Sequence, residues 1–158
     1  MHRATIVVLQ VLIVGLLALL LFCQVVVLPQ TANNMAALYP EFAQLRVPGI
    51  VIGVVFALCA QVLLVCVWRL LSLVRAGAIF SERAFVWVDV ALGAVAVATL
   101  LVVGSLIILQ IAGASPPSIS LLCLMGVVVG AGLSLLIVVL RGLLRKASQL
   151  ERDLSEVV

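Results

Sequence analysis

The stretch Arg75-Ala76-Gly77-Ala78-Ile79-Phe80-Ser81-Glu82-Arg83-Ala84-Phe85 is a short polar segment between two long, nearly uncharged runs. Ser81 is typical of a helix N-cap, and Glu82 then places a carboxylate at the positive end of the helix dipole. Phe80 and Phe85 stand at the two positions of a hydrophobic staple. We interpret this stretch as a cytoplasmic turn that joins two membrane hairpins.

The composition excludes an ordinary water-soluble domain. Of 158 residues, 66% are hydrophobic and 9% are charged, with a mean hydropathy of +1.47, whereas about a quarter of the residues of a soluble domain are charged. A formal net charge of +3, scattered along the chain, predicts no direct binding to nucleic acid. The bilayer is the solvent that can accept so much apolar surface.

The residue types that build reactive sites are scarce. The one histidine is His2, and the cysteines all lie inside apolar runs, at Cys23, Cys59, Cys66 and Cys123. A single histidine without a thiolate cluster cannot form a usual zinc or haem site. We therefore predict reduced cysteines, no metal, no cofactor and no enzymatic activity.

Four apolar runs are long enough to cross a hydrocarbon layer of about 30 Å, which takes about 20 residues. We predict spans over residues 4–28, 48–73, 82–112 and 118–140, followed by a cytoplasmic tail over 141–158. The first run is too long for the apolar core of a signal peptide, so a membrane helix is favoured. The predicted fold is a single-domain, all-α integral membrane four-helix bundle of two transmembrane hairpins, with an amphipathic C-terminal helical extension.

The cations give an orientation for these spans. In a four-span layout, Arg46 alone falls on one side, and the other side carries Arg3, Arg69, Arg75, Arg83, Arg141, Arg145, Lys146 and Arg152. The positive-inside rule then predicts that both termini and the central turn are cytoplasmic. We expect a multi-pass protein of the inner (plasma) membrane.

The segment between the first two spans, Pro29 to Pro48, is predicted to be an outside loop. Pro40 can start a short helix within it. Apolar residues recur there at spacings of three and four, which predicts a segment along the outer membrane surface, at Met35, Leu38, Phe42 and Leu45. A lid over the outer end of the bundle is the favoured interpretation, and a ligand-binding loop is the alternative.

Polar residues inside the spans suggest contacts between helices. Asp89 and Arg69 lie near the same cytoplasmic level, so we predict an interhelical polar pair, with a proton or ion site as the alternative. The glutamines of the spans could line a polar cavity, but hydrogen bonds between neighbouring helices are the favoured interpretation, at Gln10, Gln24, Gln61 and Gln110.

Small residues indicate close helix packing. Gly126 and Gly130 form a GxxxG motif in the fourth span, and Ser134 extends it by another four residues. The motif leaves open whether the neighbouring helix belongs to the same chain. Cys59 and Cys66, seven residues apart, are predicted to be packing residues on one helix face.

The tail carries an apolar heptad seam, with polar residues on the other faces. The seam consists of Leu143, Ala147, Leu150, Leu154 and Val157. A second copy of the chain, the central turn, the membrane surface or a soluble protein could cover it. The tail could also lie against the cytoplasmic ends of the bundle.

The segments 79–85 with Asp89, 143–158 and 39–48 together resemble a bacterial four-helix membrane family known only as a domain of unknown function. Members of that family are often encoded beside a small helix-turn-helix regulator. The resemblance therefore implies a membrane component of a regulatory pair, and it implies no catalytic residues.

The leading hypothesis is a non-enzymatic membrane interaction protein, the membrane partner of a small soluble transcriptional regulator. Its cytoplasmic docking face would combine the central turn, at Phe80, Ser81, Glu82 and Arg83, with the heptad seam of the tail. The alternative is an oligomeric transporter subunit for ions or small molecules, in which Asp89 and the span glutamines would act.

Overall fold

The computed structural model describes residues 3–76 and 82–157, and those residues form an all-α structure. Four helical segments are long and apolar enough to cross a membrane: Ala4–Leu38, Pro40–Arg75, Glu82–Ile111 and Pro117–Glu156. The predicted four-helix, membrane-spanning class is thereby confirmed. Phe80 and Ser81 of the central turn lie outside the described residues.

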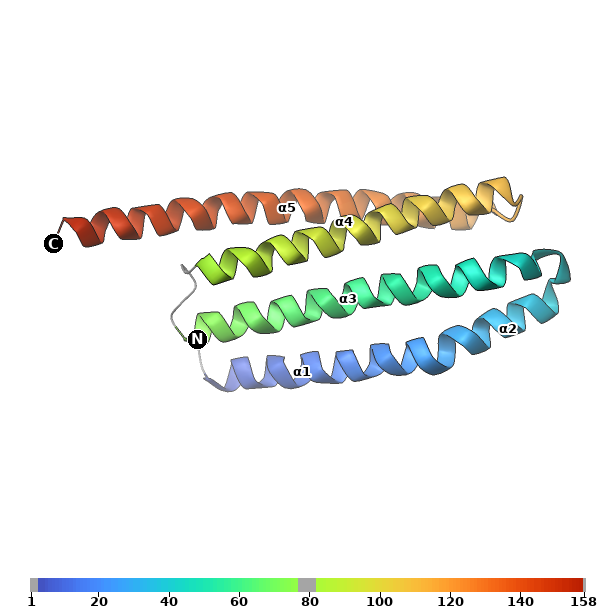
Figure 1. Cartoon of the computed structure of the whole chain (residues 1–158), viewed down its shortest axis with the longest axis horizontal. Helices are drawn as coiled ribbons and strands as arrows, with labels where there is room; N and C mark the ends of the chain where they lie inside the picture. Colours follow the sequence, from blue (N-terminus) through green and yellow to red (C-terminus); the bar gives the residue numbers. More distant parts are fainter. Residues whose placement is uncertain (1–2, 77–81, 158) are drawn as a thin grey trace.

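The first segment combines α1 (Arg3–Phe22), a π-helical turn η1 (Cys23–Val27) and α2 (Leu28–Leu38), and a 3₁₀ turn η2 (Pro40–Leu45) follows. Three long helices complete the chain: α3 (Arg46–Arg75), α4 (Glu82–Ile111) and α5 (Pro117–Glu156). Neighbours in sequence are neighbours in space, with α1 against α3, α3 against α4 and α4 against α5 (Figure 1). The first hairpin therefore consists of α1–α3, and the second of α4 and α5.

The bundle has two different ends. The terminal end carries the start of α1, the end of α3, the start of α4 and the tail of α5, and the distal end carries η2 and the α4–α5 turn (Figure 1). Few residues are buried, and these are mostly small, such as Cys66 and Ala94, whereas most large aliphatic side chains are exposed. This distribution suits lipid, because side chains that face acyl chains gain little from burial inside the protein.

The predicted loop at Pro29 is wrong, because the helix continues through this residue to Leu38. A proline removes one backbone N–H and crowds the carbonyl four residues earlier, here that of Val25. Val25 lies in the π-helical turn Cys23–Val27, whose wider i→i+5 turn provides room for the ring. The first span therefore extends beyond the bilayer instead of ending in a surface loop.

The predicted break between the third and fourth spans is confirmed. Gly113 adopts a left-handed φ of 65°, which glycine reaches without a Cβ penalty. Its N–H donates to Gln110 O at 3.2 Å, and the N–H of Ala114 donates to Leu109 O at 3.1 Å. This is the Schellman pattern that ends helices. The next helix, α5, begins at Pro117, and proline is favoured at the first position of a helix.

Helix α5 is a single helix of 40 residues, or about 60 Å at about 1.5 Å per residue. Gly142 does not interrupt it, so the predicted helical extension is confirmed. A hydrocarbon layer of about 30 Å leaves the charged segment Arg141–Glu156 outside. Figure 1 shows that this segment projects beyond the start of α4.

Candidate functional site

The apolar seam of the tail is exposed in the structure. Leu150 and Leu154 leave 63% and 70% of their surface exposed, and Leu143 and Val157 are also exposed, with Ala147 at the edge. Within the described part of the tail, Ser148 is buried. At about 100° per residue, it lies about 140° around the helix from Leu143. The seam therefore faces away from the side on which α5 is packed.

The opposite face of the tail forms a groove of about 370 Å³ with the first turn of α4. Glu82 and Phe85 contribute from α4, and α5 contributes Arg141, Arg145, Ser148, Gln149 and Arg152. Three guanidinium groups thus lie on the α5 side, and one carboxylate lies on the α4 side. The groove is polar, in contrast to the seam.

Of the described residues of the predicted docking face, Glu82 does not share a surface with the seam. Glu82 lies beside the cationic face of α5, and Arg152 on that face is about 180° around the helix from Leu143. Arg83 is exposed on the first turn of α4. The cause is the packing of α5. The face of α5 that lies toward α4 is the one opposite the seam. We therefore take the seam Leu143–Val157 as the candidate docking surface.

Asp89 does pair across helices, but its partner is Arg141 of α5, so the predicted pair with Arg69 is wrong. Arg141 Nη2 donates to Asp89 Oδ2 at 2.9 Å, and each side chain is 44% exposed. The Arg69 guanidinium instead lies over the Trp87 ring, 5.5 Å from its centroid, in a cation–π contact.

The physical reason is the helical repeat. Trp87 and Asp89 are two residues apart, which is a rotation of about 200° around α4. The two side chains therefore lie on nearly opposite faces of the helix. Since Trp87 faces α3, Asp89 faces α5. The sequence did contain the signal, because Arg141 is the first cation after the fourth span and lies at the same end as Arg69.

The GxxxG motif packs against a helix of the same chain. A Cβ built on Gly130 would collide with the side chain of Thr99, and one on Gly126 would lie 3.5 Å from Val102 Cγ1. Ser134 donates to Gly130 O at 2.9 Å within α5. The motif thus joins α5 to α4, which settles the alternative that the sequence left open.

The glutamines form hydrogen bonds between helices. Gln61 Nε2 of α3 donates to Gln24 Oε1 at 2.7 Å, and Gln24 Nε2 donates to Val54 O at 3.2 Å. Gln24 belongs to the π-helical turn. At the distal end, Gln110 Nε2 donates to Ser120 Oγ at 3.3 Å. For these three glutamines, the favoured interpretation of interhelical bonding is confirmed.

The cysteines fit the packing interpretation. All four are free, and Cys59 and Cys66 are buried on α3, Cys66 completely.

Residues 30–158 match the model of a family described as "Protein of unknown function (DUF2975)". The chain belongs to this family. The matched region begins in α2 and includes α3, α4, α5 and the seam, so the expected resemblance to a family of unknown function is confirmed, while α1 precedes the match. No curated protein and no solved structure matches the chain.

Proposed function

We propose that this multi-pass membrane protein is a non-enzymatic interaction protein that holds a small soluble transcriptional regulator at the inner membrane surface. The seam of α5 would be the docking surface, and a signal received in the membrane would release the regulator. The observation that carries this proposal is the exposure of Leu150 and Leu154 on a helix that projects beyond the bilayer.

Helical geometry supports a protein partner rather than lipid. The seam begins after Leu140, and Arg141–Glu156 extends about 24 Å past the last apolar turn. A straight helix that crosses the bilayer carries such a segment away from the acyl chains. An amphipathic helix with one apolar stripe binds a groove or another helix through side chains at spacings of three and four.

The proposed orientation rests on the charges. The described cations other than Arg46 lie at the terminal end, at the start of α1, the end of α3, the start of α4 and in the tail of α5. By the positive-inside rule, this end is the cytoplasmic one. A tail on that side can meet a DNA-binding protein, and the family resemblance implies a small helix-turn-helix regulator as the partner.

Co-purification from a mild detergent tests the proposal. The intact chain, co-expressed with a small helix-turn-helix regulator of the kind that the family resemblance implies, should retain that protein, and Leu150→Glu with Leu154→Glu should release it. The matched control, Gln149→Glu with Ser155→Glu, adds the same charge away from the seam and should retain it. The proposal is refuted if both variants retain the regulator. It is also refuted if the intact chain and both variants all fail to retain it.

The oligomeric state separates docking from self-association. Light scattering of the purified chain, without any regulator, should give the same mass for the wild type and the Leu150→Glu/Leu154→Glu variant. If the wild type is a dimer and the variant a monomer, the seam is an interface between two copies, and the proposed docking role is wrong.

The structure gives less support to a transporter subunit. Asp89 is half-exposed and held by Arg141, and the amides of Gln24 and Gln61 satisfy each other. Proton-coupled flux in liposomes, compared between the wild type and Asp89→Asn, tests this alternative. We expect no flux that depends on Asp89.

A further inference from the structure

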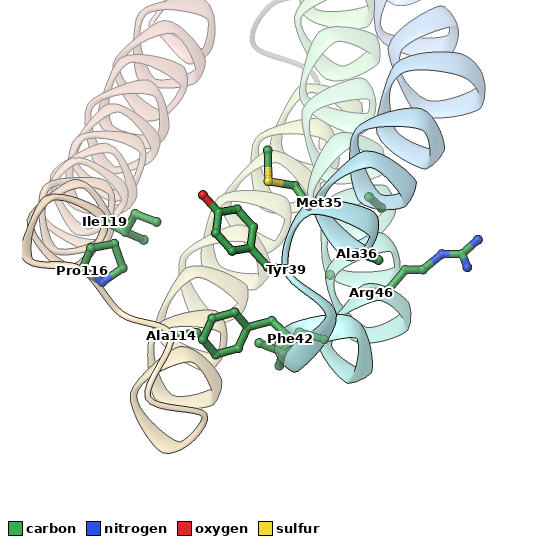
Figure 2. A pocket seen from close by; sticks show the side chains of 11 residues that line it. Met35, Ala36, Tyr39, Phe42, Arg46, Ala114, Pro116 and Ile119 are labelled. Carbon is green, nitrogen blue, oxygen red and sulfur yellow. The ribbon is translucent and has the colours of Figure 1, made fainter.

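The distal end contains a cavity of about 500 Å³ between the two hairpins. Met35, Tyr39 and Phe42 form the wall on the first hairpin, and Pro116 and Ile119 form the wall on the second (Figure 2). The remaining lining comes from Ala32, Ala36, Leu45, Arg46, Gly49 and Ala114. The segment that the sequence predicted as a lid therefore lines a cavity.

The lining is apolar apart from one hydroxyl. Tyr39 and Arg46 are the lining residues with polar side chains, and Figure 2 shows the Arg46 guanidinium pointing away from the cavity. The Tyr39 ring points toward the opposite wall, and the structure records no hydrogen bond of its hydroxyl to any described residue. Such a lining favours a ligand with an apolar body and a single hydrogen-bonding group.

The cavity is not a sign of loose packing throughout the bundle. Within the second hairpin the helices approach closely, as Gly130 of α5 does at Thr99 of α4. At the cavity, small residues keep the space open: Ala32 and Ala36 are one turn apart on α2, and a Cβ on Gly49 would meet nothing within 4 Å. A volume of about 500 Å³ lies within the range of about 300–1,000 Å³ that is usual for small-molecule sites.

Both walls are fixed by backbone structure. The Phe42 N–H donates to Tyr39 O at 3.0 Å in the 3₁₀ turn, and on the other side the Ile119 N–H donates to Pro116 O at 3.0 Å. Methionine and aromatic side chains on such supports adapt to apolar ligands of different shape. The lining therefore stands on regular backbone, and it is not narrowly selective.

We propose that this cavity is a binding site for a free apolar small molecule that partitions from the lipid phase, with the Tyr39 hydroxyl as partner of its one polar group. Because the ligand would contact both hairpins, its binding would favour one arrangement of the first hairpin relative to the second. The site goes beyond the docking proposal and does not depend on it, since no residue of the tail lines the cavity.

Photolabelling tests the site. The full chain in lipid nanodiscs would be exposed to dodecanol that carries a mid-chain diazirine, and the labelled residues would be mapped by mass spectrometry. We expect labelling of Met35, Tyr39 and Ile119 that saturates with probe concentration and is suppressed by excess plain dodecanol. Labelling that rises linearly without saturation would show lipid-like contact only, and would refute the site.

Two neighbouring alanines provide a matched pair of variants. Ala36→Phe takes up part of the cavity and should weaken saturable labelling about tenfold, which corresponds to about 1.4 kcal/mol of binding free energy. Ala37→Phe makes the same change on an exposed position that does not line the cavity, and should label as the wild type does. Equal labelling of the two variants contradicts the proposal.

Ala114→Leu narrows the cavity from the opposite wall, so it tests the site even if Ala36→Phe does not fold. It too should reduce saturable labelling. A diazirine-bearing phospholipid distinguishes the source of the ligand. If that lipid labels the same residues and excess dodecanol does not displace it, a bilayer lipid occupies the cavity, and the proposed free ligand is wrong.

Discussion

The two hairpins are held together by different interactions. In the first, Gln24 of the π-helical turn η1 bridges to α3 through Gln61 and the carbonyl of Val54. In the second, Gly130 lets α5 approach Thr99 of α4, and an ion pair joins Asp89 to Arg141 near the terminal end. Since the hydrophobic effect does not drive helices together within lipid, close packing and hydrogen bonds must do so. One hairpin relies mainly on amides, and the other on a glycine contact.

Gly130→Leu should have the largest effect, because the new side chain has no space against Thr99. The Thr99 hydroxyl already donates to Val95 O at 2.8 Å, so α4 and α5 would have to separate. We expect a loss of about 2–3 kcal/mol in the free energy of unfolding, measured by titration of mixed micelles with a denaturing detergent.

Gly132→Leu is the control, since a Cβ on Gly132 would meet nothing within 4 Å. It should cause no loss in the free energy of unfolding, and it should raise this free energy by at most about 1 kcal/mol, the helix propensity that leucine gains over glycine. Adding Thr99→Ala to Gly130→Ala should recover part of the loss that Gly130→Ala causes alone. Equal stability of the Gly130→Leu and Gly132→Leu variants would mean that glycine packing does not hold the second hairpin.

The GxxxG spacing was visible in the sequence, and so were the four spans and the break at Gly113, because length, hydropathy and turn chemistry are local properties. The partner of a charged side chain, in contrast, could not be predicted from local properties. Asp89 could pair with Arg69 or Arg141, and only the direction in which Trp87 points decides between them.

The helix through Pro29 was missed for a different reason. Proline normally ends a helix, and nothing local to residues 28–30 announces the π-helical turn that precedes it. The distal cavity was out of reach of sequence reasoning as well, because its two walls come from segments about 80 residues apart that meet only in the folded bundle.

Replacing the amides of the first hairpin should have a moderate effect. Gln24→Leu removes two hydrogen bonds, and Gln61→Leu removes one. We expect a coupling energy between the two sites of about 0.6 kcal/mol, and at most about 1.7 kcal/mol, the range measured for hydrogen bonds between membrane helices. A double-mutant cycle in the same unfolding assay measures it, and zero coupling would contradict the proposed role of the amides.

The ion pair of the second hairpin should contribute less. Both side chains are 44% exposed at the membrane edge, so water and salt screen the charges, and we expect a coupling of about 0.2–1 kcal/mol between Asp89→Ala and Arg141→Ala. The coupling should fall as salt is raised. The double-mutant cycle of Asp89→Ala with Arg69→Ala is the control and should show no coupling energy. Coupling in that cycle would mean that Asp89 pairs with Arg69, as the sequence predicted.

Gly53→Ala in the first hairpin should have the smallest effect, although a Cβ there would lie 2.9 Å from Leu28 Cδ1. The contact is with the end of a flexible side chain, which can move aside, whereas at Gly130 it is with the branched Thr99 on the facing helix. Alanine also gains about 1 kcal/mol of helix propensity over glycine, so we expect a net change near zero in the unfolding assay. Because the helix-propensity gain is the same at both sites, the difference between Gly53→Ala and Gly130→Ala isolates packing, and equal losses at the two sites would show that both hairpins depend on close glycine contact.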